Sequence, residues 1–133
     1  DAGGDIRTRG LARDQHPWRV AVRDPHKAGD RPSVVRLTDG AIATSGSYEI
    51  YYDREKLFHH IASPTTGLCP SALTSVSILA ETAMDADALS TTAFLLDPAA
   101  AIQFIDSLPG CEALALLADN TPLLSRGWPS ARL

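Results

Sequence analysis

Residues 86–92, with the sequence Ala-Asp-Ala-Leu-Ser-Thr-Thr, hold the side chains best suited to binding a metal. Asp87 and Thr91 stand four residues apart, so on a helix both project from one face. A carboxylate and a hydroxyl are hard oxygen ligands. Mg²⁺ takes few such protein ligands, because waters and substrate phosphates complete its shell. The alternative is a solvated helix face on which Thr91 bonds back to a carbonyl of its own helix, and spacing alone favours that alternative.

Small hydroxyl residues surround a glycine at Thr44-Ser45-Gly46, directly after a predicted strand. Such residues let the backbone approach a ligand closely, and exposed N–H groups can cradle an anion. The same composition is also ordinary in loops. The opening Gly3-Gly4-Asp5 indicates a tight turn entering a strand, because no Gly-x-Gly-x-x-Gly dinucleotide fingerprint follows a strand here.

A third candidate for chemistry is the pair His59-His60, which precedes a Pro- and Gly-containing loop at residues 61–67. A histidine at the end of a strand can act as a general base, because imidazole titrates near neutral pH. Strand alternation puts the two side chains on opposite faces, so at most one of them faces a given site. A purely structural histidine is the commoner alternative.

The elements that must position these residues begin with a β-rich region from about residue 17 to residue 81. Short apolar runs alternate there with turn residues, as in an antiparallel meander. Two hairpins are expected, one across Thr38-Asp39-Gly40 and one across Asp53-Arg54-Glu55. The predicted strands are residues 18–22, 33–37, 41–44, 48–52, 56–61 and 72–80.

Helical signals follow. Residues 83–96 are rich in Ala and Leu and contain no Gly or Pro, and Thr82 with Asp85 resembles a capping box. A second helix starts at Asp97-Pro98, with Asp as N-cap and Pro as the first helical residue, and Pro109-Gly110 ends it.

Two last strands are expected at residues 113–117 and 122–124, on either side of Asp119-Asn120. The sequence therefore predicts an α+β fold, in which an antiparallel sheet meander is packed by a C-terminal helix pair.

The composition is that of one acidic globular domain, with 133 residues, 44% of them hydrophobic, and a net charge of -4. Basic residues form no long runs, which argues against a nucleic-acid partner. Apolar stretches are shorter than the roughly 20 residues needed to span a bilayer. Cys69 and Cys111 lack metal-ligand spacing and are expected to be buried free thiols, with a disulfide as the alternative in an oxidising compartment.

Five blocks, taken together and in this order, resemble the ApbE family of flavin transferases. The resemblance runs from residue 1 to about residue 120. The last two blocks are the most specific. The blocks are Gly3-Gly4-Asp5-Ile6, Trp18-Arg19-Val20, Ala43-Thr44-Ser45-Gly46-Ser47-Tyr48, His60-Ile61-Ala62-Ser63-Pro64-Thr65-Thr66-Gly67 and Ala86-Asp87-Ala88-Leu89-Ser90-Thr91.

The resemblance implies an α+β fold related to the T-fold, a cleft for FAD and a bound Mg²⁺. It further implies transfer of FMN from FAD to a threonine of a target flavoprotein, with release of AMP. Some members of the family instead hydrolyse FAD to FMN and AMP. Both reactions attack the FMN phosphorus of a pyrophosphate, so metal neutralisation and positioning should dominate catalysis.

Matched position by position, the resemblance implies a role for nine residues. Asp87 and Thr91 correspond to metal ligands, and His60 corresponds to a proposed base. Thr44, Ser45 and Gly46 correspond to a flavin-binding segment. Gly3, Gly4 and Asp5 correspond to a loop that lines the flavin site.

The sequence departs from the family at the His60 block. Relatives usually read His-Ile-Ile/Val-Asp-Pro-Arg/Lys-Thr-Gly, whereas Ser63 and Thr65 stand here at the Asp and Arg positions. Losing that carboxylate and that cation weakens the network that orients His60. An FAD-binding protein with lost or reduced catalysis is therefore one alternative to a transferase. An FAD pyrophosphatase, as some family members are, is the other.

The resemblance implies that residues 1–133 are a single domain, the C-terminal part of an ApbE-like transferase whose N-terminal half is missing, because family members run to roughly twice this length. The chain also opens on Asp1 rather than on Met, and no signal peptide is visible. The resemblance implies that the other half supplies the adenine side of the cleft and at least one metal contact. It also implies a bacterial periplasmic protein or one held at the inner membrane by an N-terminal anchor, with the cytoplasm as the alternative.

Overall fold

The computed structural model describes residues 1–23, 33–48, 50–55 and 57–129. The predicted combination of an antiparallel sheet with a helix pair is confirmed. No helix in these ranges is both long and apolar enough to cross a membrane. The elements are β1 (Ile6–Thr8), β2 (Trp18–Ala21), β3 (Val34–Leu37), β4 (Gly40–Gly46), β5 (Leu73–Ala80), α1 (Ala83–Phe94), α2 (Pro98–Asp106), β6 (Glu112–Leu117) and β7 (Pro122–Leu124).

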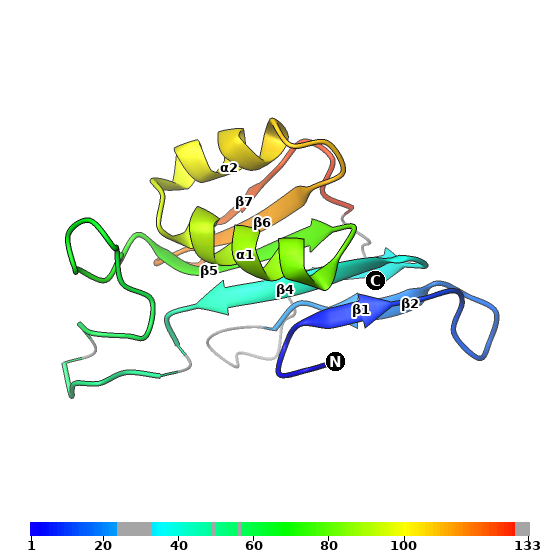
Figure 1. Cartoon of the computed structure of the whole chain (residues 1–133), viewed down its shortest axis with the longest axis horizontal. Coiled ribbons are helices and arrows are strands. Elements are labelled where there is room, and N and C mark those ends of the chain that lie inside the picture. Colours follow the sequence, from blue (N-terminus) through cyan, green and yellow to red (C-terminus); the bar gives the residue numbers. More distant parts are fainter. Residues whose placement is uncertain (24–32, 49, 56, 130–133) are drawn as a thin grey trace.

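Two antiparallel sheets form the framework (Figure 1). The larger has the strand order β1-β4-β5-β6-β7, and β2 pairs with β3 in a separate ribbon. From β4 to β7 each strand pairs with the next strand in sequence, so a meander is present, but it lies at residues 40–124 rather than within the predicted residues 17–81. Both helices are inserted between β5 and β6, so they return to the same sheet.

The hairpin predicted across Thr38-Asp39-Gly40 is wrong. The strands on either side of that turn exist, but β3 pairs with β2, and β4 pairs with β1 and β5. Val35 of β3 and Ile42 of β4 are buried in one common cluster. The turn therefore stacks the ribbon on the sheet face to face, because each bears an apolar face that must be covered.

The second predicted hairpin, across Asp53-Arg54-Glu55, reduces to a single bridge between Tyr51 and His59. The Asp53 carboxylate accepts hydrogen bonds from the backbone N–H groups of Leu57, at 2.9 Å, and Phe58, at 2.7 Å. A side chain thus binds amides that a strand ladder would have used. Positions 49 and 56 of the two predicted strands lie outside the described residues.

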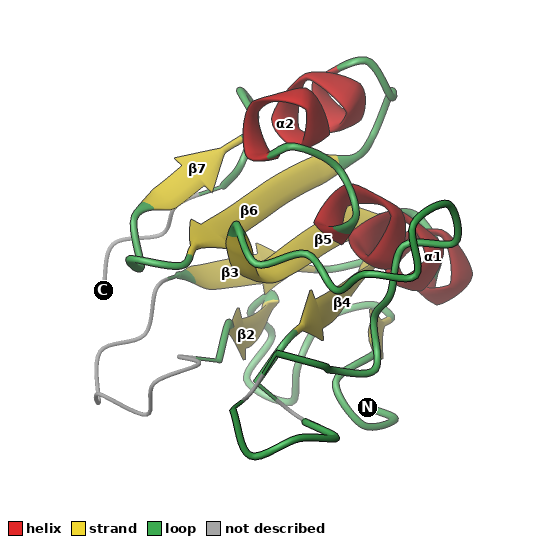
Figure 2. Ribbon diagram, turned by 90° about the vertical axis from the view of Figure 1, so that its left-hand side faces the viewer, coloured by secondary structure: helices red, strands yellow, loops and turns green. Residues whose placement is uncertain are grey.

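Strand β4 divides the interior into two cores. Ala41 and Ala43 belong to the cluster that contains Phe94 of α1, whereas Ile42 between them belongs to the cluster on the ribbon side. Figure 2 shows both helices on one face of the larger sheet. Small side chains on that face let α1 lie close to β4, which is what brings their polar residues into contact.

Both helix starts are confirmed. The Thr82 side chain accepts a hydrogen bond from the Asp85 N–H at 3.1 Å and caps α1. The Asp97 carboxylate accepts from the N–H groups of Ala99, at 3.0 Å, and Ala100, at 3.4 Å, and caps α2. These caps satisfy amides that have no partner inside their helix.

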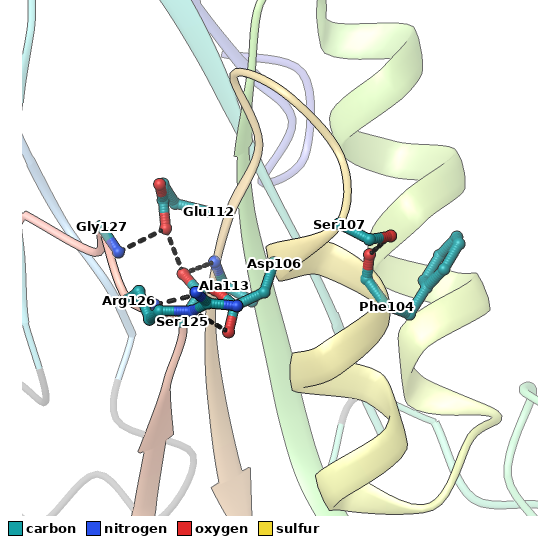
Figure 3. A network of polar contacts seen from close by, with 8 residues as sticks. All are labelled: Phe104, Asp106, Ser107, Glu112, Ala113, Ser125, Arg126 and Gly127. Atoms are coloured by element: carbon teal, nitrogen blue, oxygen red, sulfur yellow. Dashed lines mark hydrogen bonds and ion pairs between the residues drawn. The ribbon is translucent and has the colours of Figure 1, made fainter.

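A polar network ties the end of α2 to β6 and to the segment after β7 (Figure 3). The Glu112 carboxylate accepts from the Gly127 N–H at 3.0 Å and from the Ser125 hydroxyl. Asp106 accepts from the backbone N–H of Arg126 at 2.9 Å and from its guanidinium at 3.3 Å. This network fixes the last strands, far from the candidate site.

Cys69 and Cys111 are free thiols, as expected. They are half-buried rather than buried. The sulfur of Cys69 exchanges hydrogen bonds with the backbone of His59, at 3.3 Å in each direction. Burial raises the pKa of the Cys111 thiol, helped by the charges of Asp85 and Glu112, which keeps that thiol protonated.

Candidate functional site

A cavity of about 450 Å³ opens where the end of β4 faces the exposed side of α1. Four separate segments meet there: the N-terminal turn, β4, the loop that follows it, and α1. Seven of the nine residues singled out from the sequence line it: Gly3, Thr44, Ser45, Gly46, His60, Asp87 and Thr91. The fold therefore assembles one polar site from segments that are distant in sequence.

On α1, Asp87 and Thr91 face this cavity together, as their spacing predicts. The alternative, in which the Thr91 hydroxyl bonds back to its own helix, is wrong. Its Oγ1 atom lies 2.9 Å from Ser45 Oγ on β4. The neighbouring Thr92 makes the back-bond instead, donating to the Ala88 carbonyl at 2.8 Å. The Thr91 hydroxyl thus lies on the side of the helix that faces β4 and the cavity.

Strand alternation sends Thr44 and Ser45 to opposite faces of β4. Thr44 Oγ1 lies 2.7 Å from the hydroxyl of Ser77, its partner on β5. Ser45 Oγ points to α1, where it lies 2.8 Å from Ser90 Oγ as well as near Thr91. Both hydroxyls of the predicted segment therefore already have protein partners.

The two predicted residues outside the cavity wall are Gly4 and Asp5. Burial, and then the charge of Asp87, raise the pKa of Asp5 above its ordinary value of 3.8. A cation beside these two carboxylates would relieve the repulsion that Asp5 experiences. The described residues hold no group of three or more His, Cys, Asp or Glu placed for a metal. This donor set therefore suits a hard cation that completes its shell from other molecules.

A second cavity, of about 690 Å³, shares Gly3 and Thr44 with the first and adds Gly4 and Tyr48. Gly46 makes this arrangement possible, because a Cβ atom there would overlap the ring of Tyr48 and lie 3.1 Å from the Thr74 carbonyl oxygen. The turn leading into it is also glycine-dependent, since Gly3 and Gly4 have φ values of 76° and 113°. The predicted glycines thus shape the walls of two adjoining hollows.

The two histidines separate to opposite sides, as predicted, although they lie outside any regular strand. His60 is exposed and lines the first cavity, whereas His59 is buried. Nε2 of His59 lies 3.0 Å from the Pro70 carbonyl oxygen, and Nδ1 accepts from the Ile61 N–H at 3.3 Å. These partners place the proton on Nε2 and anchor the loop whose exposed member is His60.

Ser63, which replaces the usual acidic residue of the family pattern, forms a local turn. Its hydroxyl oxygen accepts from the N–H groups of Thr65, at 3.3 Å, and Thr66, at 3.4 Å. Its backbone pairs with Leu68 and Gly67 at 2.9 Å and 2.8 Å. A serine hydroxyl can close such a turn as an aspartate does, but it carries no charge.

The sequence interpretation missed Ser90 and Ser77, which hold Ser45 and Thr44 in place. Both are buried, at 0% and 1% exposure. Their signal is a hydroxyl at a position where helix or strand periodicity expects an apolar side chain. A buried hydroxyl requires a partner, and the partner here is a site residue.

The ApbE family model matches residues 1–115. The chain belongs to the ApbE family. An FAD:protein FMN transferase of Treponema pallidum is 37% identical over 127 residues, which cover 93% of this chain and 34% of the relative. Another, of Haemophilus influenzae, is 34% identical over 124 residues, which cover 90% of this chain and 36% of the relative.

Solved ApbE structures agree with the fold. The ApbE protein of Thermotoga maritima superposes with a TM-score of 0.85 at 35% identity, over 95% of this chain and 41% of that one. The flavin transferase ApbE of Vibrio cholerae gives a TM-score of 0.80 at 29% identity, over 96% of this chain and 42% of that one. The chain spans about a third of the length of the curated ApbE relatives it matches.

Proposed function

We propose that this chain is the C-terminal domain of an FAD:protein FMN transferase, which moves FMN from FAD to a threonine of a target flavoprotein. The observation that supports this best is the single cavity that gathers Asp87, Thr91 and His60 beside the end of β4. Its relatives carry that name, and they match nearly the whole of this chain. The segment that corresponds to the rest of those relatives would complete the cleft.

The reaction is a substitution at the FMN phosphorus. The threonine oxygen forms a new bond to that phosphorus, the bond from phosphorus to the bridging pyrophosphate oxygen breaks, and AMP leaves with the bonding electrons. The proton of the threonine hydroxyl must be removed. His60 is the base, because its imidazole is exposed on the cavity wall while His59 is held by its own partners.

Asp87 and Thr91 hold Mg²⁺ in this proposal, with Asp5 adding negative charge beside them. The donor set fits, since it consists of a carboxylate and a hydroxyl at one cavity and leaves room for waters and phosphate oxygens. When bound, the ion neutralises charge on the phosphates. Asp87 and Thr91 share a rigid helix, so their oxygens are positioned before any ligand arrives.

The flavin-binding role falls to Gly3, Gly4, Asp5 and the segment of residues 44–46. Gly3 and Thr44 line both cavities, so they stand at the boundary between the metal side and the larger hollow. The turn has no bulky side chains, so its backbone can approach a planar ring or a phosphate closely. Tyr48 adds an aromatic wall.

The test is transfer itself, using the full-length protein that contains this chain, with FAD, Mg²⁺ and a target flavoprotein domain. A mass gain equal to FMN on the target is expected for the wild type, and its loss for Asp87→Ala. Asp119→Asn is the matched control, because this carboxylate lies in the turn between β6 and β7, away from the cavity. No adduct with the wild type, or equal adduct with Asp87→Ala, contradicts the proposal.

Two further readouts test the alternatives to a transferase: an FAD pyrophosphatase, and an FAD-binding protein whose catalysis was lost with the carboxylate and the cation that Ser63 and Thr65 replace. Free FMN and AMP formed without any target indicate an FAD pyrophosphatase with water as acceptor. FAD binding detected by fluorescence quenching, without metal-dependent AMP, indicates a binding protein that has lost catalysis. Transfer to the target with the wild type contradicts both.

A further inference from the structure

Three hydroxyl groups form a continuous chain between β4 and α1. Ser45 Oγ lies 2.9 Å from Thr91 Oγ1 and 2.8 Å from Ser90 Oγ. Ser90 Oγ lies 2.9 Å from the backbone carbonyl oxygen of Asp87. Ser45 and Ser90 are 8% and 0% exposed, so both hydroxyls depend on protein partners.

The number of protons fixes the direction of this chain. Each hydroxyl has one proton and can accept through its lone pairs, whereas a carbonyl oxygen only accepts. Ser90 must therefore donate to Asp87, which leaves Ser45 to donate to Ser90. Thr91 then has to donate to Ser45. Three contacts use three protons in a single direction, and no other assignment satisfies all three.

From this count we infer that Ser90 and Ser45 are positioning residues that set the polarity of the Thr91 hydroxyl. The Thr91 proton points inward to β4, so the oxygen lone pairs remain for the cavity. A metal ligand must offer a lone pair, and a proton aimed at the site would repel the ion. The inference rests on the proposed function, in which Thr91 is a ligand of Mg²⁺.

The chain also links the two proposed ligands to each other. It starts at the hydroxyl of Thr91 and ends on the backbone of Asp87, through Ser45 of the neighbouring strand. Successive hydrogen bonds in one direction polarise one another, which makes the oxygen of Thr91, the first donor, a stronger acceptor. Ser90 is fully buried and absent from the cavity wall, so it acts only through this chain.

Titration of the full-length protein with Mg²⁺, followed by calorimetry, tests the inference without reference to turnover. Ser90→Ala frees the Ser45 proton to turn toward Thr91, and we expect Mg²⁺ affinity to fall about tenfold or more. Thr91→Val removes the ligand oxygen while keeping the shape of the side chain. In that background Ser90→Ala is expected to cause no further loss.

Non-additive effects of Ser90→Ala and Thr91→Val on Mg²⁺ affinity distinguish a positioning role of Ser90 from a general contribution to the stability of the fold. If Ser90 only supports the fold, its replacement weakens binding equally in both backgrounds, which overturns the inference. Thr92→Val is the matched control, because its hydroxyl lies next to Thr91 but bonds to its own helix. Affinity for Mg²⁺ should stay unchanged in that variant, and thermal unfolding of every variant shows whether the fold is kept.

Neutron diffraction from deuterated crystals gives a readout that does not involve the metal. We expect the Thr91 deuteron between Thr91 and Ser45, and the Ser45 deuteron toward Ser90. A Thr91 deuteron that points into the cavity overturns the inference even if Mg²⁺ binds. A wild-type chain that binds no Mg²⁺ overturns both the metal role and the inference built on it, whereas normal binding with an unaffected Ser90→Ala overturns the inference alone.

Discussion

The carboxylate of Asp87 on α1 raises the pKa of Asp5, which lies in the N-terminal turn. Burial contributes more to this rise than Asp87 does. Folding therefore brings two acidic groups near each other beside the cavity and makes it harder for Asp5 to be charged. Such an arrangement costs stability unless a cation joins it.

The first prediction concerns Asp5→Asn. A carboxyl group whose pKa is raised by folding stabilises the native state below its ordinary pKa of 3.8 and loses that contribution as pH rises through the higher folded value. At neutral pH without divalent ions, Asp5→Asn should be more stable than wild type. The gain should stay below about 1 kcal/mol, because water screens a partly exposed group.

Thermal unfolding with and without Mg²⁺ checks this expectation. The ion should stabilise the wild type more than Asp5→Asn, since a ligand that binds the native state raises its stability by mass action. The advantage of the variant should vanish near pH 3. Equal stabilisation of both proteins by Mg²⁺ would show that Asp5 does not contribute to binding the ion.

Gly46→Ala should destabilise the protein by about 1–3 kcal/mol, because the added methyl group overlaps the Tyr48 ring. Gly40→Ala, at the other end of the same strand, is the matched control. Its new Cβ meets nothing closer than 3.7 Å, so little change is expected there. Chemical denaturation measures both, and a Tyr48→Ala background should restore much of the loss caused by Gly46→Ala.

The adjacent histidines should respond to mutation in opposite ways. His59→Ala removes the bond to Pro70 and the edge-on contact with Phe94, whose ring centroid lies 5.7 Å away, so we expect a loss of about 2–4 kcal/mol. His60→Ala should leave stability nearly unchanged and abolish most FMN transfer. Unfolding curves and the transfer assay on the same two variants check this prediction. Loss of transfer without loss of stability in His59→Ala, and the opposite in His60→Ala, would exchange the two roles.

Asp106→Asn tests the network at the end of α2. Hydrogen bonds from the backbone N–H of Arg126 and, secondarily, from its guanidinium hold the pKa of Asp106 below its ordinary value of 3.8, despite the opposing effect of burial. A lowered pKa means that the stabilisation is present above that ordinary value and is lost as pH falls through the folded pKa. The variant should therefore be less stable than wild type at pH 7. The gap should close below pH 3 in a pH series of thermal unfolding, and a gap independent of pH would contradict the role of the charge.

Much of the architecture follows from local signals in the sequence. Thr82 and Asp97 mark the helix starts because a side-chain oxygen must bind amides within the next few residues. The spacing of Asp87 and Thr91 fixes their common face for the same reason, since helix geometry depends only on neighbours along the chain. The alternation of β4 likewise determines that Thr44 and Ser45 point to opposite sides.

The tertiary structure decided which other element each face of a strand or helix packs against. The turn before β4 suits a hairpin, yet β3 and β4 stack through Val35 and Ile42, because covering two apolar faces is a property of the whole domain. The same holds for the Thr91 hydroxyl, whose partner on β4 lies 46 residues away in sequence. The sequence determined which groups the site contains, and packing of α1 on β4 determined where their protons point, since hydrogen bonds form between neighbours in space.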